Sequence, residues 1–133
     1  MLHRRKKRTG AATVELAIFL PLLVILTFGA IELTSLIYLK QRLLTAAYEA
    51  ARIASGPRQT STAAINTGMA VLSARGITNG SIAISPDPVT INTPSGTEIS
   101  ATASAPFAEN ASLPPFVLPN FDDVTVTVVM MRQ

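Results

Sequence analysis

The sequence predicts an α+β fold: a long N-terminal transmembrane α-helix, then a small extracytoplasmic antiparallel β-sheet domain with a short second helix. Three observations predict it. Residues 16–31 carry no charge and directly follow a block of basic residues. Gly56 and Pro57 interrupt the helical pattern that continues from this run. Near the end of the chain, Val124, Val126 and Val128 alternate with polar residues, as in a half-buried strand.

The composition is that of one small, apolar domain and argues against enzyme chemistry. Of the 133 residues, 48% are hydrophobic and only 14% are charged, whereas an ordinary soluble domain has roughly 25% charged residues. The chain has no cysteine, and its single histidine, His3, lies in the basic N-terminal segment. A disulfide framework, a thiol nucleophile and a histidine cluster are therefore excluded. We expect no catalytic residue, no cofactor and no metal.

The positive charge is concentrated in one block. Residues 4–8 are all Arg or Lys, whereas the chain after residue 10 has six basic and eight acidic groups. The block contains no aromatic residue and directly precedes the apolar run, so nucleic acid is not an expected partner. Basic residues are retained on the cytoplasmic side of a membrane. We therefore expect the N-terminus in the cytoplasm and the rest of the chain on the other side of the membrane.

The apolar segment is long enough to cross a lipid bilayer. Residues 16–31 would extend about 24 Å as a helix, which is short of the roughly 30 Å hydrocarbon core. The apolar character continues to Leu39, so residues 11–39 suffice, with Glu15 and Glu32 near the two interfaces. Glu32 would be a functional-site candidate if it lay inside the bilayer; its distance from Glu15 favours the alternative, that it is solvated among the outer headgroups. A cleaved secretory signal fits poorly, because cuts after Ala30 or Ala50 would place an aromatic residue three positions before the cut.

The junction before the span resembles a known processing site. It has the sequence RRKKRTGAATVEL, in which a basic leader ends at Gly10, small residues follow, and Glu15 precedes the apolar helix. This is similar to type IV pilin-like precursors, and most closely to the TadE-like pseudopilins of the tight-adherence (Tad) pilus. The stretches FLPLLVILTFGAIEL and TAAYEAARIAS are similar to the same family. One departure is Leu16, where the family usually has an aromatic residue.

The resemblance implies a processed, pilin-like helix in a bacterial inner membrane, with the C-terminus in the periplasm, or in the extracellular pilus after assembly. A prepilin peptidase would cut between Gly10 and Ala11, and Glu15 would become the fifth residue of the mature chain. In such assemblies this carboxylate is thought to pair with the freed amine of a neighbouring subunit; alternatively, Glu15 only complements the helix N-terminus. Pro21 would kink the helix for filament packing, or it is simply a proline that a membrane helix tolerates.

The helix is predicted to continue to Ser55 and to carry a stripe of small residues. These are Ala46, Ala47, Ala50, Ala51 and Ala54. Small residues allow close helix packing, either on another subunit's helix or against the chain's own sheet. A second helix is predicted over 60–74, capped near Gly76 and weakened by Gly68.

The remaining chain predicts three or four antiparallel strands. Residues 82–84 and 89–91 alternate around Pro86-Asp87-Pro88, which we interpret as a hairpin-like connection. Further strands are predicted over 97–105 and 123–131. Four prolines predict that residues 106–121 form no regular element, although the segment is strongly apolar. It either covers the sheet or contacts other subunits.

Together these features predict a minor pilin of a Tad-type (type IVc) pilus that supports pilus assembly and surface adhesion. Its expected parts are a leader over 1–10, a transmembrane and extended pilin-like helix over 11–55, and an extracytoplasmic head over 56–133. Its expected partners are the prepilin peptidase, other pilin or pseudopilin subunits, the inner-membrane assembly platform and the lipid bilayer. The alternative is an unprocessed single-pass inner-membrane adaptor that binds another envelope or secretion component.

Overall fold

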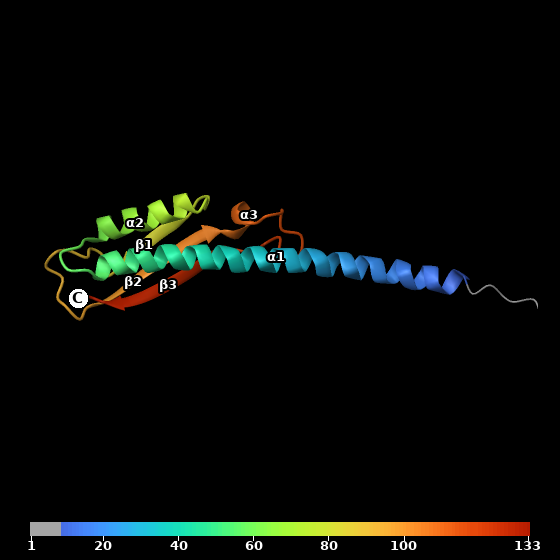
Figure 1. Cartoon of the computed structure of the whole chain (residues 1–133), viewed down its shortest axis with the longest axis horizontal. Coiled ribbons are helices and arrows are strands. Elements are labelled where there is room, and N and C mark those ends of the chain that lie inside the picture. Colours follow the sequence, from blue (N-terminus) through green and yellow to red (C-terminus); the bar gives the residue numbers. More distant parts are fainter. Residues whose placement is uncertain (1–8) are drawn as a thin grey trace, which may run out of the picture.

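The predicted fold class is confirmed by a computed structural model that describes residues 9–133. The basic block at residues 4–8, and His3 with it, lies outside the described residues. A single long helix runs along the molecule, and a small head packs against its C-terminal half (Figure 1). In chain order the elements are α1 (Thr9–Ser55), α2 (Ser61–Ala74), β1 (Ser81–Ser85), β2 (Glu98–Pro106), α3 (Phe107–Asn110) and β3 (Asp123–Met131).

The sheet has three antiparallel strands in the order β1-β2-β3. Side chains alternate between its faces, so Ile99 is fully buried while Glu98 is exposed. The open face carries mainly hydroxyl groups, which pair across the strands: Thr102 with Thr127 at 2.9 Å, and Ser81 with Ser104 at 2.8 Å. One face of the sheet is therefore available to receive helices, and the other remains polar.

The core is enclosed by the buried face of the sheet and by the two helices α1 and α2. α2 runs beside α1 (Figure 1). Alanines lie where these elements meet, and their small side chains allow the backbones of neighbouring elements to approach closely. The largest fully buried side chains lie around them: Phe107, Leu39, Leu43, Leu72, Ile99 and Val89. Burial on α1 begins at Glu32, so the head covers only the second half of the helix.

The predicted strand at 89–91 is wrong, and so is the hairpin at Pro86-Asp87-Pro88. β1 pairs instead with β2, across the loop 86–97. Prolines cannot donate to a strand ladder, and two of them separate β1 from Val89. Val89 instead anchors the loop to the start of α2: its N–H donates to Ser61 Oγ at 2.6 Å, and the Ser61 N–H donates to the Val89 carbonyl at 3.0 Å.

The expectation that residues 106–121 contain no regular element is wrong for α3. Pro106 stands at the N-cap of this short helix, where the missing N–H costs no helical hydrogen bond. Phe107 is completely buried and anchors α3 in the core. Asn110 ties α3 to the turn before β1, because it donates to the Thr78 carbonyl at 3.0 Å and accepts from the Thr78 N–H at 2.8 Å.

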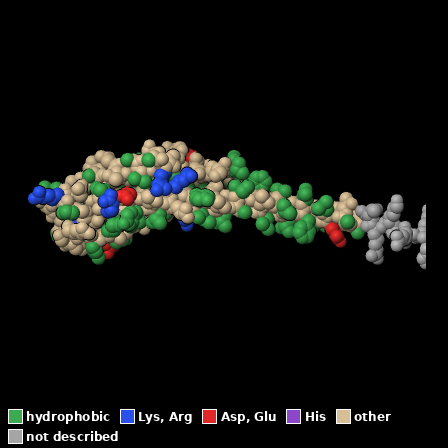
Figure 2. All heavy atoms as spheres, in the orientation of Figure 1, with side chains coloured by type: hydrophobic (Ala, Val, Ile, Leu, Met, Phe, Trp, Pro, Cys, Tyr) green, Lys and Arg blue, Asp and Glu red, His purple; other side chains and the backbone are tan. Residues whose placement is uncertain are grey.

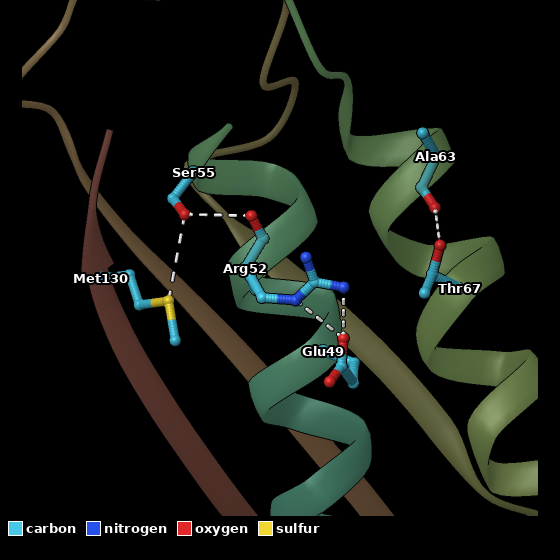
Figure 3. Close-up of polar contacts among 6 residues, drawn as sticks. All are labelled: Glu49, Arg52, Ser55, Ala63, Thr67 and Met130. Atoms are coloured by element: carbon cyan, nitrogen blue, oxygen red, sulfur yellow. Dashed lines mark hydrogen bonds and ion pairs between the residues drawn. The ribbon is translucent and has the colours of Figure 1, made fainter. Parts of the chain in front are cut away.

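The end of α1 is tied to the end of β3. Arg132, only 4% exposed, donates to the carbonyls of Ala54 at 2.7 Å and Gln59 at 3.3 Å from Nη1, and to Thr90 at 3.0 Å from Nη2. Ser55 donates to the Arg52 carbonyl and lies 3.9 Å from Met130 Sδ (Figure 3). Two of these carbonyls, those of Arg52 and Ala54, lie in the last turn of α1, where carbonyls have no partner within the helix.

Gly68 is a packing residue in α2 as well as a weak helix former. A Cβ at this position would lie 2.9 Å from Ile82 Cγ1 and 3.1 Å from Ala50 Cβ. The missing side chain thus lets α2 approach both α1 and β1. This contact explains why a glycine lies within a helix at a cost of roughly 1 kcal/mol in helix propensity.

The Gly68→Ala substitution is expected to lower the free energy of unfolding by about 1 kcal/mol, because overpacking outweighs the gain in helix propensity. Urea unfolding of the full chain in detergent, followed by circular dichroism, measures this change. The Asn66→Ala substitution on the exposed face of α2 is the matched control and should be neutral or stabilising. An equal gain from both substitutions would contradict the packing role of Gly68.

Candidate membrane-spanning and assembly segment

The first half of α1 is a bare apolar helix. Every residue from 10 to 28 is exposed, including Leu26 at 69% and Val14 at 60%. Hydrophobic side chains surround this part of the helix, while most charged side chains lie on the head (Figure 2). Among residues 9–133, α1 is the one helix long and apolar enough to cross a membrane. The architecture fits a single-pass membrane protein, because so large an apolar surface requires a nonaqueous environment.

Gly10 and Ala11 lie in the first turn of α1, where both are exposed. A Cβ added at Gly10 would meet no atom within 4 Å, so the fold itself does not require a glycine there. Glu15 follows one turn later and is also exposed. Glu15 forms no ion pair with any residue from 9 to 133. In this part of the chain an ion pair joins Arg52 and Glu49 at 2.7 Å (Figure 3).

Pro21 lies within an uninterrupted helix. It lacks the N–H that would bond to the carbonyl of Ala17, yet α1 is assigned as helical from Thr9 to Ser55. A proline at this position is compatible with a membrane helix, where neighbouring groups can satisfy the freed carbonyl. A functional kink at Pro21 stays a prediction.

The small-residue stripe lies inside the chain's own core. Its five members are completely buried: Ala46, Ala47, Ala50, Ala51 and Ala54. The structure therefore uses these residues to bring α1 close to α2 and the sheet, and they offer no surface to another subunit. In this half of α1 the exposed large apolar residues are different ones, and four of them are each about half exposed: Leu33, Ile37, Leu44 and Tyr48.

These four residues share one face of α1, since their spacings of 4, 7 and 4 follow the helical repeat. Glu15 precedes Leu33 by 18 residues, or about five turns, and so lies on the same face. The sequence alone does not reveal this face, because the second half of α1 also carries the apolar residues that pack into the core. Only the tertiary structure distinguishes the apolar residues of α1 that are buried in the core from those that stay exposed.

The expectation that Glu32 is solvated among headgroups is wrong. Its side chain is 3% exposed and accepts hydrogen bonds from three consecutive backbone N–H groups. Oε1 accepts from Phe116 and, at 2.7 Å, from Val117, and Oε2 accepts from Leu118 at 2.9 Å. Glu32 therefore fixes the Pro-rich segment after α3 to α1. The partners lie 84 to 86 positions away in sequence, so no local pattern predicts the contact.

The arrangement supports anchoring and packing. Among residues 9–133 no group of three or more His, Cys, Asp or Glu side chains is placed to hold a metal ion. Between residues 10 and 39 the charged side chains are two carboxylates. Glu15 is exposed, and Glu32 is buried and accepts backbone hydrogen bonds. α1 continues without a break from this apolar half into the small head (Figure 1).

A bare membrane-length helix that continues into a small α+β head fits a single-pass membrane protein. Residues 10–52 match the family model described as TadE-like protein, so the resemblance drawn from the sequence is confirmed over this segment. The matched residues lie within α1 and do not include the head. No curated protein and no solved structure gives a significant match.

Proposed function

We propose that this protein is a minor pilin, or pseudopilin, of a Tad-type pilus, processed by prepilin peptidase and supporting pilus assembly and surface adhesion. The observation that supports this most strongly is the bare half of α1, which carries Glu15 one turn beyond the Gly10–Ala11 bond and is continuous with the head. An adaptor has no use for this cleavage junction. The family match over residues 10–52 supports the same assignment.

Processing requires access to the Gly10–Ala11 bond. The bond lies in the exposed first turn of α1, so the turn must open before a peptidase can bind it as an extended strand. Terminal turns without tertiary contacts open at little cost in free energy. Glycine also allows close backbone approach in the peptidase. Cleavage would remove the five basic residues at 4–8, which lowers the cost of extracting the helix from the bilayer.

Assembly would use the exposed face of α1. Glu15 would pair with the new amine of Ala11 on a neighbouring subunit, which offsets the cost of a carboxylate in an apolar surrounding. The face formed by Leu33, Ile37, Leu44 and Tyr48 would continue the contact along the head. Other pilin or pseudopilin subunits and the inner-membrane assembly platform are the partners that this surface suits.

Intact mass spectrometry of the protein from its own host tests the proposal. We expect the membrane fraction to contain a chain beginning at Ala11, and the sheared surface fraction to contain the same mature chain. A chain that retains residues 4–10 in cells with active prepilin peptidase would overturn the proposal. That result would favour an unprocessed single-pass inner-membrane adaptor.

The Glu15→Ala substitution is expected to leave membrane insertion unchanged and to remove the protein from the sheared fraction. The reason is that the methyl group cannot pair with the neighbouring amine, while an apolar residue is tolerated in the span. Glu98→Ala, which removes an exposed carboxylate from the head, is the matched control. Normal recovery of the Glu15→Ala protein in the sheared fraction would contradict the pairing role.

A further inference from the structure

The segment 112–119 is an apolar loop held at one level of α1. The backbone N–H of Ser112 donates to Ser35 Oγ at 3.4 Å, and the N–H groups of Phe116, Val117 and Leu118 donate to Glu32. Three of the eight residues are prolines, which have no N–H, so only Leu113 has an N–H left to donate elsewhere. The loop thus satisfies nearly all of its backbone donors through α1.

This level coincides with the outer end of the uncharged run. The rings of Phe116 and Phe28 are 5.7 Å apart between centroids, and Phe28 lies within residues 16–31. A membrane that contains Phe28 therefore reaches Phe116. No charged residue occurs between Glu109 and Asp122, so the loop brings no charge to this boundary.

The exposed side chains of the loop suit lipid better than water. Phe116 is 62% exposed, and Leu113 and Val117 are each 42% exposed. They continue the apolar surface of the bare helix at the point where the head begins. Backbone donors close to hydrocarbon must find partners within the protein, and Glu32 supplies three of them.

We propose that the segment 112–119 is a second membrane contact, which seats the head on the surface of the bilayer that α1 crosses. Phe116 and Leu113 enter the interfacial region, and Glu32 holds the loop in the shape that allows this. The occupant of this surface is lipid, because the loop is continuous with the apolar surface of α1. The inference rests on the membrane span of the proposed function and is independent of cleavage at Gly10.

Tryptophan fluorescence tests the contact, since the chain contains no tryptophan. Three variants place the probe at sites of similar exposure: Phe116→Trp at 62%, Phe19→Trp in the bare helix at 64%, and Ile91→Trp in the loop 86–97 at 61%. Ile91 follows Thr90, which binds Arg132 near the end of α1, so it reports on the opposite end of the head. Each full chain is reconstituted in vesicles of phosphatidylethanolamine and phosphatidylglycerol that contain brominated lipid.

For Phe116→Trp we expect emission at shorter wavelength than for Ile91→Trp, and loss of most intensity when bromine is near the headgroups. Phe19→Trp should be quenched as well, and Ile91→Trp should not. Quenching of Phe19→Trp without quenching of Phe116→Trp would overturn the loop contact and leave the span intact. Absence of quenching in Phe19→Trp would overturn the span, and the loop contact with it.

A second subunit, in place of lipid, would give another pattern. Phe116→Trp would then be shielded from aqueous quencher only at high protein-to-lipid ratio, with no quenching by brominated lipid, and the proposal would be wrong. The positioning role of Glu32 is tested by adding Glu32→Ala to the Phe116→Trp chain. Quenching near the headgroups should be lost, whereas adding Glu49→Ala on the same helix should preserve it. Equal quenching with both additions would overturn the role of Glu32.

Discussion

The Gly10→Leu substitution is expected to abolish the mature chain that begins at Ala11 and to leave a membrane-bound precursor. The physical reason is that the proposed peptidase must approach the backbone at this position, and a side chain with a Cβ prevents that approach. The fold gives no competing reason, because a Cβ at Gly10 would meet no atom of the described chain within 4 Å. Intact mass spectrometry of the membrane fraction measures the ratio of precursor to mature chain.

A matched control adds the same bulk elsewhere on the bare helix. Ala17→Leu changes another exposed position of α1, leaves the junction unaltered, and should be processed normally. Gly10→Ala should give an intermediate ratio, because its side chain is the smallest that carries a Cβ. Processing of the Gly10→Leu chain at the rate of the unchanged protein would show that the cleavage site lies elsewhere.

The Arg132→Met substitution is expected to lower the free energy of unfolding by about 3 kcal/mol. Methionine has a similar length and cannot donate, so the carbonyls of Ala54 and Gln59 lose the guanidinium donor. The carbonyl of Thr90 keeps a bond from the Thr93 N–H at 3.1 Å. The loss is large because the Ala54 carbonyl lies at the C-terminus of α1, where it attracts positive charge. Part of this loss in the free energy of unfolding is offset, because the positive charge of Arg132 is costly to bury and the substitution removes it.

Thermal unfolding of the full chain in detergent should show this as a fall of roughly 10 °C in the melting temperature. Arg42→Met is the matched control, since Arg42 is an exposed arginine on α1 and should change the temperature little. Arg132→Lys should recover part of the loss, because one ammonium group can reach fewer carbonyls than the planar guanidinium. Equal falls for Arg132→Met and Arg42→Met would contradict the role of the buried hydrogen bonds.

Elements that depend on local pattern could be predicted from the sequence. The sequence predicts a second helix over 60–74, and this helix occurs as Ser61–Ala74 with Thr60 as its N-cap. The last strand occurs at Asp123–Met131, as the sequence predicts. These elements are defined by periodicity and capping within a few residues. The predicted strand at 89–91 does not form, because alternation alone does not show whether a segment has a partner strand. Val89 alternates with Ile91, yet it is held by Ser61 on α2.

The sequence by itself determined the membrane-length helix, its basic flank and the α+β class, because composition and short spacing are sufficient for each. Cleavage between Gly10 and Ala11 stays a prediction from the family resemblance. Only the tertiary structure decided that the alanine stripe is core, that Glu32 binds the loop near Phe116, and that Arg132 binds the end of α1. The physical reason is distance along the chain. Hydrogen bonds between residues 73 to 86 positions apart form only after the sheet and helices have packed, so no local pattern encodes them.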